Sequence, residues 1–147
     1  MGKQYYLGID VGSVSTNLVL LDDKGSLVYR DYLRTMGQPI KVVQEGLRSL
    51  KERVWDAEIA GVGTTGSGRK LAGIMVGADV VKNEITTHAV AALDTNPAVN
   101  TILEIGGQDS KIIILRDGIV SDFAMNTVCA AGTGSFLDRQ AARLQIP

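Results

Sequence analysis

The sequence predicts an α/β fold in which an antiparallel three-stranded meander occurs twice. Two separate segments each contain three short apolar runs joined by glycine-containing turns, which is the pattern of consecutive hairpins. Residues with helical periodicity lie between the two segments. Asn96-Pro97 interrupts the last of these helices, so we expect a first subdomain over residues 1–97 and the incomplete start of a second over residues 98–147.

The first meander begins close to the N-terminus. Gly12-Ser13 separates its first two apolar runs, and the turn Asp22–Gly25 separates the second run from the third. Glycine and aspartate favour such turns, because glycine tolerates unusual backbone angles and the aspartate side chain bonds to nearby amides. The expected strands are Tyr5–Asp10, Thr16–Leu21 and Leu27–Arg34.

Helices and one strand occupy the middle of the chain. Pro39 suits a first helical turn, and apolar residues recur at helical spacing up to Leu50. Glu84 and His88 are four residues apart, which predicts an intrahelical pair. The expected elements are a helix from Pro39, a strand over Ile59–Thr64, and helices over Arg69–Met75 and Asn83–Leu93.

The second meander repeats the first and leads into a final helix. Gly106–Asp109 and Asp117-Gly118 are its turns. The expected strands are Thr101–Ile105, Lys111–Arg116 and Ile119–Met125. The helix covers Gly134–Leu144, with Thr133 as a candidate cap and with Phe136, Leu137 and Leu144 as core contacts.

Composition excludes several classes of function. The 147 residues have a formal net charge of −1 with scattered basic residues, so we expect no nucleic-acid partner. No apolar run approaches the roughly 20 residues that span a bilayer, and no signal-like segment precedes the first strand. One cysteine makes no internal disulfide. We expect a cytoplasmic protein without a membrane partner.

The first glycine turn places an acidic residue at the end of a strand. Asp10 is followed by Gly12 and by the hydroxyls of Ser13 and Ser15, with Val14 between them. Backbone amides in such a turn can surround phosphate oxygens, and the carboxylate can hold Mg²⁺ through water. An ordinary tight turn has the same composition, so this turn alone leaves both interpretations open.

The second glycine turn has carboxylates at both ends. Glu104 precedes Gly106-Gly107-Gln108, and Asp109 and Lys111 follow. Two such turns facing each other can bind the β- and γ-phosphates of a nucleotide with its metal ion, where chemistry needs mainly positioning and charge neutralisation. Because neither turn ends in Lys-Ser/Thr and no Gly-x-Gly-x-x-Gly opens a helix, a P-loop or Rossmann site is disfavoured.

The only cysteine, Cys129, lies in a small-residue loop that runs into the last helix, over Asn126–Gly134. A helix N-terminus favours the thiolate, the form of cysteine that binds metal or attacks an electrophile. A lone cysteine is also a common buried apolar residue. Both interpretations stay open at this point.

Together these motifs resemble a known family. The turn pair Gly8–Ser13 and Ile105–Asp109, followed by Met125–Asp138 with its Cys-Ala-Ala-Gly-Thr-Gly stretch, is similar to the ATP-dependent activators of 2-hydroxyacyl-CoA dehydratases. The ATPase subunits of benzoyl-CoA reductase are relatives of these activators. The resemblance covers the whole chain and implies a ribonuclease H-like (actin-like ATPase) fold with a mixed sheet, an antiparallel N-terminal meander and a truncated second copy.

The resemblance implies roles for individual residues. Asp10, Gln108 and Asp109 would be catalytic, and Cys129 would be the first cysteine ligand of an iron–sulfur cluster. The nucleotide would be bound by Gly12, Ser13, Val14, Ser15, Glu104, Gly106, Gly107, Gln108, Lys111, Gly132 and Gly134.

The family's activity would require ATP/ADP, Mg²⁺ and one 4Fe-4S cluster shared across a homodimer. Reduced ferredoxin or flavodoxin would supply the electron, and a 2-hydroxyacyl-CoA dehydratase or related reductase would accept it. In relatives, the second cluster cysteine and the adenosine-binding segment lie beyond the position of Pro147. We therefore expect an N-terminal fragment with an incomplete cluster and weak nucleotide affinity.

Two alternatives use the same fold. One is a small-molecule kinase of amino-sugar type, which would need a catalytic base and a sugar pocket. The other is a non-enzymatic, actin-like nucleotide-binding module in which Cys129 is only a core residue.

Overall fold

The structure, a computed structural model, describes residues 4–126 and 133–146. The chain forms two compact units, Met1–Asn83 and Glu84–Pro147, and each unit is described by itself. In the described part of the chain, no helix is long and apolar enough to cross a bilayer.

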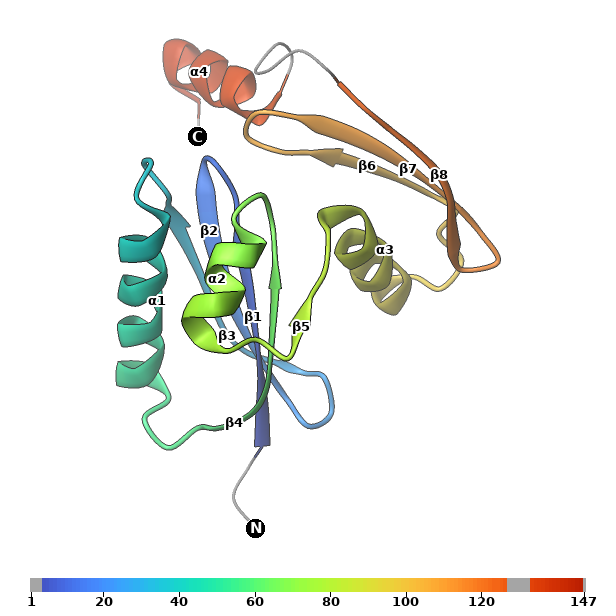
Figure 1. The fold of residues 1–147 in the computed structure, drawn as a ribbon. Coiled ribbons are helices and arrows are strands. Elements are labelled where there is room, and N and C mark those ends of the chain that lie inside the picture. Colours follow the sequence, from blue (N-terminus) through green and yellow to red (C-terminus); the bar gives the residue numbers. More distant parts are fainter. Residues whose placement is uncertain (1–3, 127–132, 147) are drawn as a thin grey trace. The chain divides into compact units, whose positions relative to one another are not determined.

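The first unit is built on a five-stranded mixed sheet with the order β3-β2-β1-β4-β5 (Figure 1). The three N-terminal strands pair antiparallel, and β1 pairs parallel with β4, which in turn pairs parallel with β5. Because β1 and β4 are parallel, their carboxyl ends lie at the same edge of the sheet. The strands are β1 Gln4–Val11, β2 Ser15–Asp22, β3 Leu27–Arg34, β4 Glu58–Thr65 and β5 Val80–Val81.

Two helices, α1 (Pro39–Arg53) and α2 (Arg69–Val76), cover one face of this sheet. Alternate residues of β1 and β2 point to that face, and Ile9, Leu18 and Leu20 are at most 1% exposed. Burying each of these side chains contributes about 1.5–3 kcal/mol. The core holds β1 and β2 rigidly, and with them the turn that joins the two strands.

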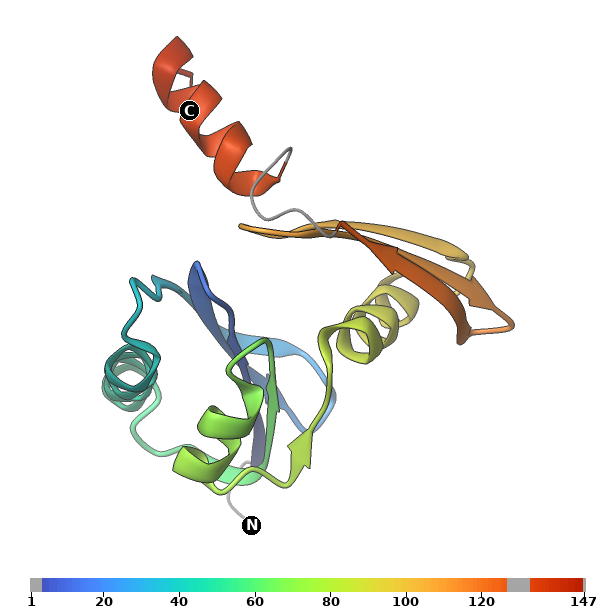
Figure 2. The same ribbon diagram turned by 45° about the horizontal axis from the view of Figure 1, so that its top comes forward.

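The second unit pairs one helix with an antiparallel sheet of order β6-β7-β8 (Figure 2). Ala89 of α3 packs against the buried Ile113 and Leu115 of β7. Asp117 and Gly118 both have positive φ, as the predicted two-residue hairpin turn requires. The elements are α3 Glu84–Thr95, β6 Thr101–Ile105, β7 Ser110–Arg116, β8 Ile119–Met125 and α4 Gly134–Leu144.

All the predicted strands and helices are present, most of them within one or two residues of their expected ends. The two-residue strand β5 was missed, because it is too short to show periodicity. The compact units divide at Asn83/Glu84, because α3 packs on the second sheet. The expected subdomain boundary at residues 97/98 stays a prediction. The expected core contacts of α4 are wrong: Phe136, Leu137 and Leu144 are 44–67% exposed.

Candidate functional site

The first turn holds its shape through main-chain and side-chain hydrogen bonds at the ends of β1 and β2. The Gly12 amide donates to the Ser15 carbonyl at 2.8 Å, which closes a two-residue loop of Ser13 and Val14. Asp10 lies opposite Asn17 in the β1–β2 ladder, and Asn17 Nδ2 donates to Asp10 Oδ2 at 3.2 Å. The turn thus presents one oriented carboxylate next to a tight loop.

Thr35, directly after β3, braces the same turn. Its hydroxyl donates to the Gly12 carbonyl at 2.9 Å, and its amide donates to the Val14 carbonyl at 2.9 Å. The Thr16 hydroxyl lies 3.0 Å from the Thr35 hydroxyl. Both threonines are at most 3% exposed. Sequence reasoning missed Thr35, because a single threonine after a strand carries no pattern.

The Gly66–Gly68 segment packs against the end of β1. Gly66 has φ +91°, and a Cβ atom there would overlap Asp10 Oδ1 and the Val11 carbonyl. The Gly68 amide donates to the Val11 carbonyl at 2.8 Å, while Arg69 Nη1 donates to the Gly66 carbonyl at 3.0 Å. Only glycine permits this close approach to Asp10. The sequence identified this segment as a helix-starting turn, and α2 does begin at Arg69.

The second turn repeats the geometry of the first. The Gly106 amide donates to the Asp109 carbonyl at 2.8 Å and closes a loop of Gly107 and Gln108. A Cβ atom on Gly106 would come within 2.8 Å of Asp109 Oδ1 and 3.1 Å of Glu104 Oε1. A side chain at position 106 would therefore push on both carboxylates where they converge.

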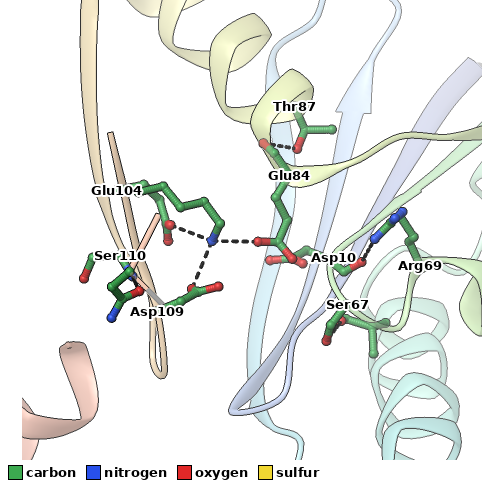
Figure 3. Close-up of polar contacts among 12 residues, drawn as sticks. Asp10, Ser67, Arg69, Glu84, Thr87, Glu104, Asp109 and Ser110 are labelled. Atoms are coloured by element: carbon green, nitrogen blue, oxygen red, sulfur yellow. Dashed lines mark hydrogen bonds and ion pairs between the residues drawn. The ribbon is translucent and has the colours of Figure 1, made fainter. Parts of the chain in front are cut away.

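Lys111 lies at the centre of three carboxylates in the second unit. Its Nζ atom is 2.8 Å from Glu84 Oε2, 2.9 Å from Glu104 Oε2 and 2.9 Å from Asp109 Oδ1, and Figure 3 shows these side chains pointing at that nitrogen. The Lys111 side chain is 5% exposed. Burial by itself would lower the pKa of Lys111, but the three carboxylates outweigh burial and hold that pKa above its ordinary value.

Glu84 was not identified as a site residue from the sequence. The predicted pairing of Glu84 with His88 is replaced by the ion pair with Lys111, which is 27 residues away in the chain. Asn126 also supports this region: its Oδ1 atom accepts from the Ser110 amide at 2.8 Å.

The N-terminus of α4 is attached to the second turn. The Gly134 amide donates to the Gly106 carbonyl at 2.9 Å, and the Ser135 amide donates to the Gly107 carbonyl at 3.2 Å. The hydroxyls of Thr133 and Ser135 also donate to the Gly107 carbonyl. Thr133 therefore occupies the N-cap position, but its hydroxyl bonds to the turn and not to the helix. Amides that would otherwise be unpaired at the helix start are used to hold the turn.

The structure gathers the predicted site residues into two groups, one in each unit. Asp10 and Gly12–Ser15 form the first group, and Glu104, Gly106–Asp109, Lys111 and Gly134 form the second. Cys129 and Gly132 lie outside the described residues.

The residues present fit a magnesium nucleotide by their chemistry. Mg²⁺ is usually held by one or two carboxylates together with water and phosphate oxygens, and each turn brings a carboxylate to a tight loop that begins with glycine. Among the described residues, no group of three or more His, Cys, Asp or Glu side chains is arranged to hold a metal ion by itself. This chain has a single cysteine, so two copies supply only two of the four thiolates that a 4Fe-4S cluster takes.

The fold and the paired turns define a protein of the actin-like ATPase class, and the predicted fold class is confirmed. Residues 7–147 match the BadF/BadG/BcrA/BcrD ATPase family, and the chain belongs to this family. The resemblance found in the sequence is thereby confirmed.

Three similar proteins are dehydratase activators. The (R)-2-hydroxyglutaryl-CoA dehydratase activating ATPase of Acidaminococcus fermentans is 38% identical over 147 residues, which cover 97% of this chain and 54% of the relative. The activator of lactoyl-CoA dehydratase of Anaerotignum propionicum is 38% identical, over 96% of this chain and 54% of the relative. The solved activator of the 2-hydroxyisocaproyl-CoA dehydratase from Clostridium difficile, with bound ADPNP, is 32% identical with a TM-score of 0.77, and the match covers 97% of this chain and 53% of that one. The chain spans about half the length of these relatives.

Proposed function

We propose that this chain is part of an ATP-hydrolysing activator that delivers an electron to a 2-hydroxyacyl-CoA dehydratase or a related CoA-ester reductase. The observation that carries the proposal is the repeated glycine turn, Gly12–Ser15 and Gly106–Asp109, in a chain of the BadF/BadG/BcrA/BcrD ATPase family. Relatives that activate such dehydratases, and one solved with bound ADPNP, support it.

Each turn would bind phosphate oxygens of ATP through its backbone amides. Asp10 and Asp109 would hold Mg²⁺ through water, and Gln108 would orient the attacking water. Gly12–Ser15, Gly106 and Gly107 would approach the phosphates closely, and Gly132 and Gly134 would also bind the nucleotide. In phosphoryl transfer the protein takes little part in the covalent chemistry. These rigid turns would therefore supply most of the catalysis by positioning the phosphates, the metal ion and the attacking water.

Cys129 would be a thiolate ligand of the cluster. A 4Fe-4S cluster, when bound, supplies a one-electron carrier. Reduced ferredoxin or flavodoxin would give the electron, and the dehydratase would receive it while ATP is hydrolysed. Two copies of this chain supply two of the four thiolates that hold such a cluster. The full-length protein would therefore act as a homodimer in which each copy contributes Cys129 and a second cysteine from outside this chain.

Nucleotide chemistry is tested in the full-length protein with Asp10→Asn. The variant should hydrolyse ATP about 10²–10³-fold more slowly, because a positioned charge is removed from the phosphate site. Asp56→Asn, an exposed change in the first unit, is the control and should be unaffected. Equal ATPase rates in the two variants would contradict the role of the first turn.

The cluster is tested by anaerobic reconstitution of the full-length protein. An iron–sulfur absorption band should form and should be lost with Cys129→Ser. Unchanged iron content in that variant would rule out Cys129 as a ligand. ATP consumption that depends on an added sugar, without bound iron, would instead favour the kinase alternative.

A further inference from the structure

We propose that Lys111 is a positioning residue: its ammonium group holds the Glu104 and Asp109 carboxylates at the second turn and excludes a free divalent cation from between them. The effect of Lys111 on the Mg²⁺ dependence of ATP hydrolysis rests on the proposed function. The exclusion of a cation by Lys111 is independent of that function, because it concerns the protein without nucleotide.

The hydrogen-bonding capacity of Lys111 is fully used inside the protein. An ammonium group has three N–H donors, and three carboxylate oxygens lie 2.8–2.9 Å from Nζ. With the side chain 5% exposed, no donor remains for a phosphate oxygen. Lys111 therefore acts on a bound nucleotide through its partners and not by direct contact.

The three partners come from three different elements. Glu84 is the first residue of α3, Glu104 lies in β6, and Asp109 ends the second turn. One ammonium group thus connects the turn to the start of α3. A displacement of the Asp109 carboxylate would change the partners of Lys111, and through Lys111 those of Glu84.

Comparison with the first meander indicates why a cation is needed here. Asn17 is opposite Asp10 in the β1–β2 ladder, and Lys111 is opposite Glu104 in the β6–β7 ladder. In the first meander a neutral amide bonds to the carboxylate opposite it. In the second, three carboxylates converge, and an ammonium group stands in the equivalent place. The number of converging carboxylates accounts for the lysine.

The ammonium group occupies the position that a cation would take among these oxygens. Three carboxylates and one ammonium carry a formal charge of −2, so the cluster attracts cations while its centre is filled. Carboxylate oxygens are the ligands that Mg²⁺ and Mn²⁺ prefer. Removing the ammonium group should therefore create a divalent-cation site that the natural chain lacks.

Mn²⁺ binding to the 147-residue chain without nucleotide tests this inference. Lys111→Met should bind Mn²⁺ at least about ten-fold more tightly than the natural chain, and adding Glu104→Gln should remove the gain. Arg116→Met is the matched control, because it removes an exposed cation from the same strand. Its Mn²⁺ affinity should equal that of the natural chain.

A charge-balanced variant covers the case in which Lys111→Met fails to fold. Lys111→Met combined with Glu84→Gln leaves two carboxylates and no ammonium group, so the formal charge of the cluster stays at −2. It should also gain Mn²⁺ binding that depends on Glu104. A folded variant without that gain would overturn the inference, as would Glu104-dependent Mn²⁺ binding of equal strength in the natural chain.

Lys111→Met combined with Glu84→Gln also separates this inference from the proposed function. In the full-length protein, this double variant should shift the Mg²⁺ concentration that gives half-maximal ATP hydrolysis. A merely structural role for Lys111 would leave that Mg²⁺ concentration unchanged. If the full-length protein hydrolyses no ATP, the proposed function fails, while Mn²⁺ binding without nucleotide still decides the role of Lys111.

Discussion

Lys111 donates to Glu104 across the β6–β7 ladder at 2.9 Å, in the position where Asn17 donates to Asp10 across the β1–β2 ladder at 3.2 Å. The adjoining turns close with equivalent amide-to-carbonyl bonds of 2.8 Å. The two halves of the repeat therefore share one backbone design. They differ in the charge that surrounds the strand-end carboxylate.

Replacing Gly66 with alanine should destabilise the first unit strongly. Alanine at positive φ costs about 1–2 kcal/mol, and overlap with Asp10 and the Val11 carbonyl should cost a further 1–3 kcal/mol or so. Gly25→Ala is the control, because Gly25 also has positive φ but a Cβ there meets nothing within 4 Å. Urea unfolding should give the larger loss for Gly66→Ala. Equal losses of unfolding free energy in the two variants would show that the contact with Asp10 does not prevent a Cβ atom at position 66.

Replacing Thr35 with valine should cost about 1–3 kcal/mol of stability, because the Gly12 carbonyl and the buried Thr16 hydroxyl lose their partner. The double variant with Thr16→Val should be destabilised by less than the sum of the two single changes, since the hydroxyls bond to each other. Thr101→Val, at an exposed position, should change stability by less than about 0.5 kcal/mol. If the stability losses of Thr35→Val and Thr16→Val simply added in the double variant, the hydrogen bond between the two hydroxyls would be contradicted.

Replacing Ser135 with alanine should loosen the start of α4 from the second turn. Losing the hydroxyl bond to the Gly107 carbonyl should cost about 1 kcal/mol. The amides of Gly134 and Ser135 should then exchange with solvent about five-fold faster, given that about 1.4 kcal/mol is a factor of ten. Ser121→Ala removes an exposed hydroxyl that also bonds to a carbonyl, and it should leave α4 exchange unchanged. Faster exchange in both variants would point to a general effect.

The ion pairs of Lys111 should make the free energy of unfolding fall as the pH rises into the alkaline range. The folded-state pKa of Lys111 is raised above the unfolded value of 10.5, so its contribution is fully present below that pH and is lost as pH rises through the folded pKa. Above pH 10.5, the natural chain should lose up to about 1.4 kcal/mol per pH unit more than Lys111→Met. Urea titrations of both chains over this range measure the difference. Parallel curves would show that Lys111 is not stabilised by its partners.

Much of the fold followed from local pattern. Short apolar runs bounded by glycine turns predicted β1, β2 and β7, and Asp117-Gly118 predicted its hairpin. Both signals arise from neighbouring residues and depend little on the rest of the chain. The strand β5 and the exposure of α4 could not be predicted in the same way. The first is too short to show a period, and the second depends on what packs against the helix.

The sequence by itself determined the repeated meander, the two glycine turns and the membership of the family, since these depend on residue type and spacing along the chain. Only the tertiary structure decided that Thr35 and Gly66 shape the first turn and that Glu84 joins Lys111 at the second. Thr35 is 23 residues from Gly12, Gly66 is 56 from Asp10, and Glu84 is 27 from Lys111. The contacts arise because sheet pairing and helix packing bring distant residues together, and no local pattern records that.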